Sequence, residues 1–201
     1  MAVAEDTVGA VSVRERNRQR IRSAIVRAAM ESFAACGMAE TTMDRIATEA
    51  GIARATVFKH FPNKNAIIAA VVEQMDVDLL QQVERHACRP VSAFERISGF
   101  MEENGALLES RSEVIRPLVP ILEQGWNEVP GEARMQRLRM AFVRLAAGPE
   151  QRPDAEPLAE IVLGAYLVIA HNWRVSADYS IRDHMRGVAE LLGRGLKDPA
   201  P

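Results

Sequence analysis

Apolar residues recur at intervals of three and four along most of the chain, and this spacing predicts helices rather than strands. Leu, Ala, Met, Arg and Glu are abundant, while runs of β-branched residues are scarce, which also favours helix. The first helix begins near Arg14, and Gly37 is placed to end it in a left-handed conformation. Its apolar stripe is formed by Ile21, Ile25, Ala28, Ala29 and Phe33. The pattern predicts an all-α fold.

Two short helices joined by a tight turn are predicted between Thr41 and Lys64. Thr41 is expected to cap the first, with Asp44 three residues later in a near capping box. Gly51 supplies the turn, and the second helix runs from Ala53 to about His60. The residues expected to face inward are Met43, Ile46, Ala47, Ala50, Val57 and Phe61. Such a unit places its second helix in the major groove of DNA.

The rest of the chain predicts a helical body. A long helix begins at Lys64 and ends by Pro90, and a helix over 94–108 follows. Pro117 and Pro120 are expected to break the next segment, and a helix is predicted from Gly131 to Ala147. Residues 148–157 are expected to form a loop. Two final helices are predicted over 158–175 and 181–196, the first with one apolar stripe for its own chain and another for a partner.

Charge separates these two parts. Residues 14–64 hold ten Lys or Arg and five Asp or Glu, a balance of +5, and residues 65–201 hold fifteen and twenty, a balance of −5. A basic first quarter on an acidic body indicates a polyanionic partner at one end. Five arginines stand within nine residues, at Arg14, Arg16, Arg18, Arg20 and Arg22. We expect them to contact phosphates, although a helix face that is merely exposed to solvent would show the same pattern of arginines.

The segment TTMDRIATEAGIARATVFKHFPNKNAII resembles the DNA-binding signature of the TetR/AcrR family of transcriptional regulators. It matches the family pattern at Thr42, Ile46, Ala47, Ala50, Gly51, Thr56, His60, Phe61 and Lys64. Ala53, Phe58 and Asn65 depart from it, since Ser, Tyr and an acid are usual there. The resemblance covers about the first third of the chain.

The resemblance implies a set of DNA-binding residues in this segment. Thr42, Thr56, His60 and Lys64 fall on its matched positions, and the last three are expected to contact phosphates. Arg54, Ala55 and Lys59 are the expected contacts to base edges, and Lys59 could equally bind a phosphate. The implied organisation is a leader over 1–13, expected to be disordered, a three-helix helix-turn-helix domain over 14–64, and a ligand-binding and dimerisation domain over 65–201.

Other kinds of chemistry have little support in the sequence. Two cysteines make no disulfide framework, and four scattered histidines lack a metal-ligand spacing. We therefore expect no metal, no cofactor and no catalysis. The N-terminus lacks the positive charge of a signal peptide, and no apolar run reaches the ~20 residues of a membrane helix. The expected location is the cytoplasm, with no membrane partner.

The body is expected to bind a small molecule and to pair with a second copy. The large or polar side chains that could line an effector site are Phe94, Phe100, Met101, Trp126, Phe142, Tyr166, His171 and Asn172. Most of them could equally fill the core. The resemblance implies a homodimer formed through residues 158–196.

Together these features predict a repressor that binds a palindromic double-stranded operator and is released by an apolar or amphipathic effector. A DNA-binding dimer without an effector, or a small helical enzyme, remains an alternative. The identity of the effector, the operator sequence and the regulated genes are left open.

Overall fold

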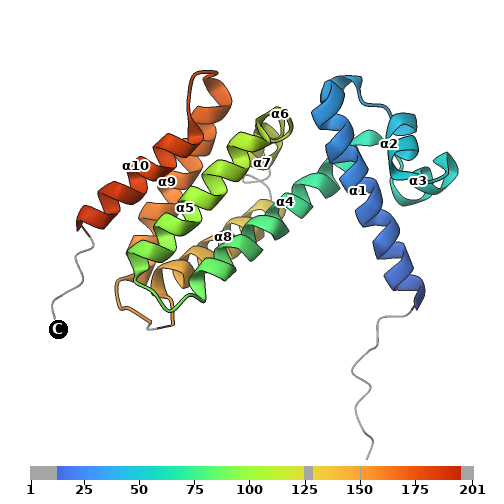
Figure 1. The fold of residues 1–201 in the computed structure, drawn as a ribbon. Helices are drawn as coiled ribbons and strands as arrows, with labels where there is room; N and C mark the ends of the chain where they lie inside the picture. Colours follow the sequence, from blue (N-terminus) through green and yellow to red (C-terminus); the bar gives the residue numbers. More distant parts are fainter. Residues whose placement is uncertain (1–12, 125–128, 150, 196–201) are drawn as a thin grey trace, which may run out of the picture. The chain divides into compact units, whose positions relative to one another are not determined.

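The computed structural model describes residues 13–124, 129–149 and 151–195, and every regular element in these ranges is helical (Figure 1). The predicted all-α fold is confirmed. Contacts divide the chain into two compact units between Val71 and Val72, inside helix α4 (Lys64–Ala87). The first unit is called the head and the second the body. Of the expected leader, only Val13 is described, and it begins the first helix.

The head consists of α1 (Val13–Glu40), α2 (Met43–Ala50), α3 (Arg54–His60) and the first two turns of α4. Of the predicted inward-facing residues, Ile46, Ala47, Val57 and Phe61 are buried, whereas Met43 and Ala50 are only half-buried. The start of α4 joins this core, whose fully buried members are Ile25, Ala29, Phe33, Ile46, Val57, Phe61, Ile67 and Val71. Short helices such as α2 and α3 are marginal alone, so this shared core holds them.

The connection from α1 to α2 differs from the sequence prediction in two ways. Gly37 has a positive φ of 79° but a ψ of 159°, so it kinks the helix, and a further turn follows to Glu40. The N-cap of α2 is Thr42, whose hydroxyl accepts from the amide of Arg45. The prediction that Thr41 is the cap was wrong. Thr41 is buried, and its hydroxyl lies 2.8 Å from the carbonyl of Gly37 and 3.2 Å from that of Ser32, between which it shares its one proton.

The body is a bundle built from the rest of α4 and the helices that follow it. These are α5 (Ala93–Ser110), α6 (Ser112–Ile115), the 3₁₀ helix η1 (Arg116–Leu118), α7 (Val119–Gln124), α8 (Val129–Ala147), α9 (Ala155–Val175) and α10 (Ile181–Gly195). Helix α10 packs along α5, and α8 packs along α9. The expected break at Pro117 and Pro120 is confirmed, because the chain there forms three short pieces.

Two helices of the body begin earlier than predicted. Helix α8 begins at Val129 rather than Gly131, and α9 begins at Ala155 rather than Leu158. Pro157 therefore lies in the first turn of α9, where a missing backbone N–H costs little. The expected loop over 148–157 therefore loses its last three residues to α9.

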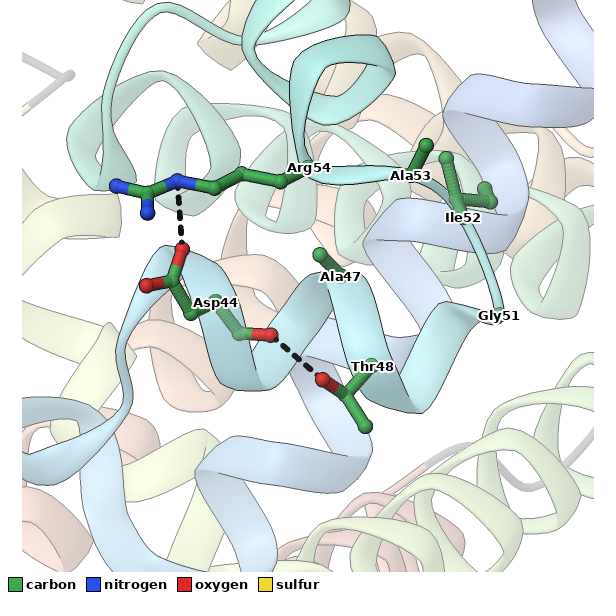
Figure 2. A pocket seen from close by; sticks show the side chains of 7 residues that line it. All are labelled: Asp44, Ala47, Thr48, Gly51, Ile52, Ala53 and Arg54. Carbon is green, nitrogen blue, oxygen red and sulfur yellow. Dashed lines mark hydrogen bonds and ion pairs between the residues drawn. The ribbon is translucent and has the colours of Figure 1, made fainter.

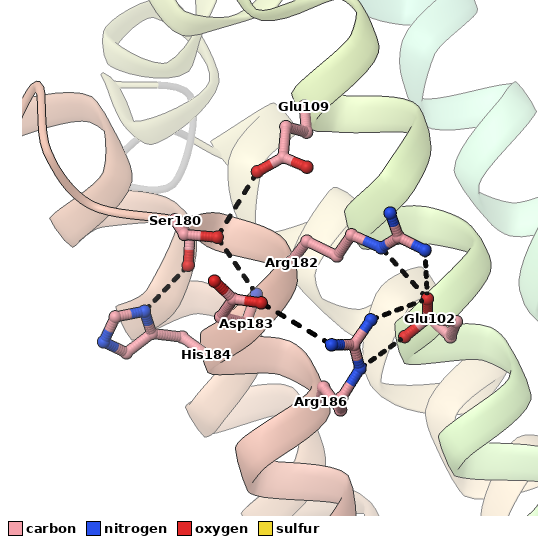
Figure 3. Close-up of polar contacts among 7 residues, drawn as sticks. All are labelled: Glu102, Glu109, Ser180, Arg182, Asp183, His184 and Arg186. Atoms are coloured by element: carbon pink, nitrogen blue, oxygen red, sulfur yellow. Dashed lines mark hydrogen bonds and ion pairs between the residues drawn. The ribbon is translucent and has the colours of Figure 1, made fainter.

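Buried and half-buried charges tie the body helices together. The buried Arg96 of α5 donates to the carbonyls of Leu145 and Ala146 at 3.0 Å each, at the end of α8. Figure 3 shows a second connection, where Glu102 of α5 faces Arg182 and Arg186 of α10 at 2.6 and 3.1 Å. These contacts join α5 to α8 and to α10.

Candidate nucleic-acid interface

Helix α3 presents one polar face to solvent. Arg54, Ala55 and Lys59 are exposed and Thr56 is half-buried, while Val57 between them is fully buried. The residues expected to read bases therefore lie on the open side of α3. A helix anchored on one side and open on the other has the form of a recognition helix.

The turn before α3 sets the direction of that helix. Gly51 is left-handed, with φ 63° and ψ 31°, and its amide donates toward the carbonyls of Ala47 and Thr48. Ala53 caps α3 without any side-chain hydrogen bond, as its missing hydroxyl predicts. The first turn of α3 thus lacks a side-chain cap, which is typically worth about 1 kcal/mol.

Arg22 of α1 holds the other end of α3. Its Nη1 donates to the carbonyl of His60 at 3.2 Å, and its guanidinium carbon lies 4.3 Å from the centroid of the Phe61 ring. A cation at a helix C-terminus is stabilising. One of the five clustered arginines therefore positions the recognition helix, a role that the sequence did not indicate.

Lys64 is engaged inside the head. Its ammonium donates to the carbonyls of Met38, Ala39 and Thr41 at 2.9, 3.1 and 3.1 Å. An ammonium has three N–H donors, so these bonds use all of them. The expected phosphate contact at Lys64 stays a prediction, and the geometry gives the residue a structural role as well. Thr42 is likewise occupied, as the cap of α2.

A basic hollow lies between the start of α1 and the end of α3. Its lining is Arg14, Asn17, Arg18, Ile21, Lys59 and His60. Burial first, and then the charges of Arg22, Arg18 and Lys59, lower the pKa of His60. This repulsion among like charges would be relieved by an anion, so the hollow is suited to a phosphate.

At the start of α3, Arg54 lies over the N-terminal end of α2. Its Nε is 2.9 Å from Oδ1 of Asp44, and both side chains are exposed (Figure 2). Its guanidinium carbon lies 5.5 Å from the centroid of the Phe58 ring. The strongest expected base-reading residue is thus oriented by two neighbours, neither of which was predicted to do this.

In the body, three of the expected effector residues meet. The rings of Phe100 and Phe142 are 5.4 Å apart edge to face, and Tyr166 lies 6.0 and 5.8 Å from them. Burial raises the pKa of Tyr166, with a further contribution from Asp76, so its hydroxyl stays protonated and can donate. The cluster is apolar with one donor, and all three side chains are buried in the core of the body.

The other expected effector residues lie elsewhere or fall outside the description. Met101 is fully buried, and Phe94 is half-buried against Gly193, where an added Cβ would collide with its ring. His171 is exposed and Asn172 half-buried near the end of α9. Trp126 lies outside the described residues. The structure therefore does not gather all eight residues around one point.

Sequence reasoning missed an ion pair beside the aromatic cluster. Asp76 of α4 pairs with Arg134 of α8 through both carboxylate oxygens, and both side chains are largely buried. Arg134 also donates to the carbonyl of Leu122 in α7 at 2.8 Å. The two residues are far apart in sequence, so no local pattern could have found them.

Helices α9 and α10 leave an apolar face exposed, although one predicted stripe was wrong. Of that stripe, Leu158, Val162 and Ile169 are buried, whereas Ile161 and Val168 are each 58% exposed. Leu191 of α10 is 67% exposed, and no atom lies within 4 Å of a Cβ built on Gly164 or Gly187. The outward face, here called the α9/α10 face, consists of Ile161, Gly164, Val168, Val175, Gly187, Val188 and Leu191.

Among the described residues, no group of three or more His, Cys, Asp and Glu side chains is arranged to hold a metal ion. In the same residues, no helix has both the length and the apolar character needed to cross a membrane.

The chain is similar to known bacterial transcriptional regulators. Residues 25–71 match the family model described as bacterial regulatory proteins, tetR family. The chain is 28% identical over 164 residues to the HTH-type transcriptional repressor SCO4008 of Streptomyces coelicolor, covering 80% of this chain and 81% of that protein. A TetR-family regulator (ECA1819) from Pectobacterium atrosepticum matches with a TM-score of 0.69 and 21% identity, covering 92% and 98%.

A third match is to a ligand-bound protein. FadR from Bacillus subtilis, solved in complex with stearoyl-CoA, matches with a TM-score of 0.60 and 16% identity, over 87% of this chain and 98% of that one. At this identity the likeness concerns the fold.

Proposed function

We propose that this chain, whose residues 25–71 match the tetR family model, is a transcriptional repressor of that family that binds a palindromic operator as a homodimer and is released by a small molecule. The observation that carries this proposal is the recognition helix α3, whose polar face is open and flanked by the basic hollow. The relatives reported above are regulators rather than enzymes.

The head supports DNA binding in two distinct ways. The exposure of Arg54 and Ala55 at the start of α3 supports them as contacts to base edges, and the lining of the basic hollow supports Arg14, Arg18, Lys59 and His60 as contacts to phosphates. Arg22 and Lys64 hold the head together, so α3 meets DNA as a fixed element. Phosphate contacts give affinity, and base contacts give the operator sequence.

The α9/α10 face supports a dimer. It is an apolar strip along two neighbouring helices, with open space above two glycines that would let a second helix approach closely. A symmetric pair presents the same face twice, and a palindromic operator mirrors that symmetry. Two recognition helices would have to stand about 34–36 Å apart to enter successive major grooves.

The body supports an effector of apolar or amphipathic character. The ring cluster of Phe100, Phe142 and Tyr166 adjoins the Asp76–Arg134 pair, so apolar and polar groups converge. Asp76 lies on α4, which continues into the head. A ligand that favoured another arrangement of α4 would shift operator affinity only by its differential affinity for the two arrangements.

The test has three parts on the full chain. The first is binding to DNA upstream of its own gene at several salt concentrations, where we expect affinity to fall steeply as salt rises. The second is sedimentation, where we expect a dimer. The third is a thermal-shift screen with apolar and amphipathic compounds. A dimer that binds DNA but responds to no compound would favour the alternative regulator without an effector.

A further inference from the structure

The guanidinium of Arg54 is oriented without being packed. Nε lies 2.9 Å from Oδ1 of Asp44, and the Phe58 ring lies to one side at 5.5 Å. The hollow beside it is lined mostly by small residues, and Figure 2 shows the side chain extending from the start of α3 toward Asp44. The lining consists of Asp44, Ala47, Thr48, Gly51, Ile52, Ala53 and Arg54. Asp44 and Phe58 therefore restrain a side chain that packing leaves free to move.

The pair leaves the reading end of Arg54 available. Asp44 approaches the guanidinium most closely at Nε, and within the described residues neither terminal nitrogen, Nη1 or Nη2, makes a hydrogen bond. These two nitrogens form a planar fork whose spacing matches O6 and N7 of guanine. A guanidinium held at Nε thus presents the fork that guanine requires.

Asp44 could either keep Arg54 away from DNA or position it, and the strength of the ion pair relative to an Arg–guanine contact decides between these roles. An exposed ion pair changes an equilibrium by up to about five-fold, whereas a bidentate Arg–guanine contact discriminates by about 5- to 150-fold. The pair is therefore too weak to keep Arg54 from a guanine. It is strong enough to limit the conformations of a long side chain before binding, which lowers the cost of ordering it.

We propose that Asp44 is a positioning residue that holds Arg54 by Nε, so that its terminal nitrogens read one guanine in each half of the operator. The inference rests on the proposed function and adds the base class that the head recognises. Asp44 also places a negative charge beside DNA, which repels phosphates at every sequence. It thus lowers general affinity and raises the preference for one base.

The test compares variants of the full chain on operators selected from random duplex DNA by the unaltered protein. Each base pair of the selected operator is then replaced in turn. We expect a guanine in each half-site whose preference is abolished by Arg54→Ala. Asp44→Ala should reduce the same preference about two- to five-fold, while binding to unrelated DNA stays equal or becomes tighter. Asp44→Asn, which keeps an acceptor oxygen, should retain part of the preference.

Glu49→Ala is the matched control, because it removes one exposed negative charge from the same helix away from Arg54. It should raise general affinity and leave the guanine preference unchanged. In Asp44→Ala/Arg54→Ala, preference at that position should equal that of Arg54→Ala alone. Thermal unfolding of each variant shows whether a lost base preference results from unfolding of the head.

Three results would overturn the proposal. Asp44→Ala could keep the full guanine preference, it could tighten operator binding without changing any preference, or the double variant could lose preference additively at a second base. The last result would mean that Asp44 reads its own base, such as cytosine. Failure of the proposed function is distinguishable, because then the unaltered protein would select no operator at all.

Discussion

At the scale of single residues, the head depends on basic side chains that bind backbone carbonyls. Lys64 binds the carbonyls of Met38 and Ala39 at the end of α1 and that of Thr41 after it, and Arg22 binds the last carbonyl of α3. The bonds at the ends of α1 and α3 satisfy carbonyls that a helix end leaves without an intrahelical partner. Part of the basic charge of the head therefore serves the fold, and the rest faces outward.

Lys64→Met should separate these two roles. Losing three charge-assisted bonds at a half-buried site should lower the free energy of unfolding by about 1–3 kcal/mol, measured by urea titration. The control is Lys59→Ala, an exposed site, which should change stability by less than about 0.5 kcal/mol while weakening binding to all DNA sequences. If Lys64→Met left stability unchanged and weakened DNA binding, its phosphate contact would be its main role.

His60 makes a second residue-scale prediction, which concerns pH. Its pKa is lowered in the folded head from an ordinary value of 6.5, so the unfolded chain takes up the proton first. The stability that this group contributes is present above about pH 6.5 and is lost as pH falls toward the folded pKa. A phosphate in the basic hollow favours the imidazolium, so DNA affinity should rise as pH falls through the same window.

The measurement is operator affinity between pH 7.5 and 5.5 for the unaltered chain and for His60→Asn, which does not titrate. The variant should lose most of the rise in affinity. His86, His171 and His184 remain in both proteins, so their contributions cancel in the comparison. Identical pH profiles would remove His60 from the phosphate site.

Single residues also mark where sequence reasoning succeeded and failed in the head. The capless Ala53 and the turn at Gly51 follow from local chemistry, and both are confirmed. Thr41 and Thr42 are adjacent, and which one caps α2 depends on the kink at Gly37 before them. The bonds of Lys64 join residues 23 to 26 positions apart, so no local pattern could indicate them.

At the scale of elements, the junction of α5 and α8 depends on one glycine. Gly148 follows α8 with φ 60°, and a Cβ there would collide with the guanidinium of the buried Arg96. That guanidinium holds the last carbonyls of α8. A side chain at this position would therefore strain the backbone and displace the buried charge.

Gly148→Ala should lower the free energy of unfolding more than Gly51→Ala does. Gly51 has a similar φ of 63° but nothing within 4 Å of its added Cβ. Gly51→Ala should therefore lower the free energy of unfolding only by the cost of a left-handed alanine, about 1–2 kcal/mol. Gly148→Ala adds the displacement of Arg96, and we expect about 3 kcal/mol or more. Equal losses in the two variants, measured by urea titration, would mean that Arg96 moves aside freely.

Helix α9 shows why element-scale prediction was incomplete. Its sequence is apolar on nearly every side, so periodicity gave two stripes but could not say which residues face the body. Contacts with α8 and α10 bury Leu158, Val162 and Ile169 and leave Ile161 and Val168 outside. The same holds for the effector residues, because the contact of Phe100, Phe142 and Tyr166 joins three different helices.

At the scale of the whole molecule, the proposed dimer makes the α9/α10 face the element on which operator binding depends. Ile161→Asp combined with Leu191→Asp places charges at two exposed apolar positions, so the fold of one chain should be kept while pairing is lost. In sedimentation, the double variant should have half the mass of the unaltered protein. The control is Met140→Asp, at an exposed apolar residue of α8, which should leave a dimer.

The variants at the α9/α10 face should also weaken DNA binding by the head. A single head reaches one half-site, so loss of the dimer should weaken operator binding by about 10²-fold or more, although the head itself is unchanged. A double variant that stays dimeric would place the contact between copies elsewhere. Full operator affinity in a variant shown to be monomeric would contradict the two-headed account.

The most direct test of the central claim is the affinity of the full chain for DNA upstream of its own gene, measured by fluorescence anisotropy between about 50 and 200 mM salt. The account predicts binding of a two-fold symmetric site, with affinity falling by about 10³-fold or more across this range as phosphate contacts are screened. Affinity that did not change with salt, or that was equal for every DNA sequence, would contradict it.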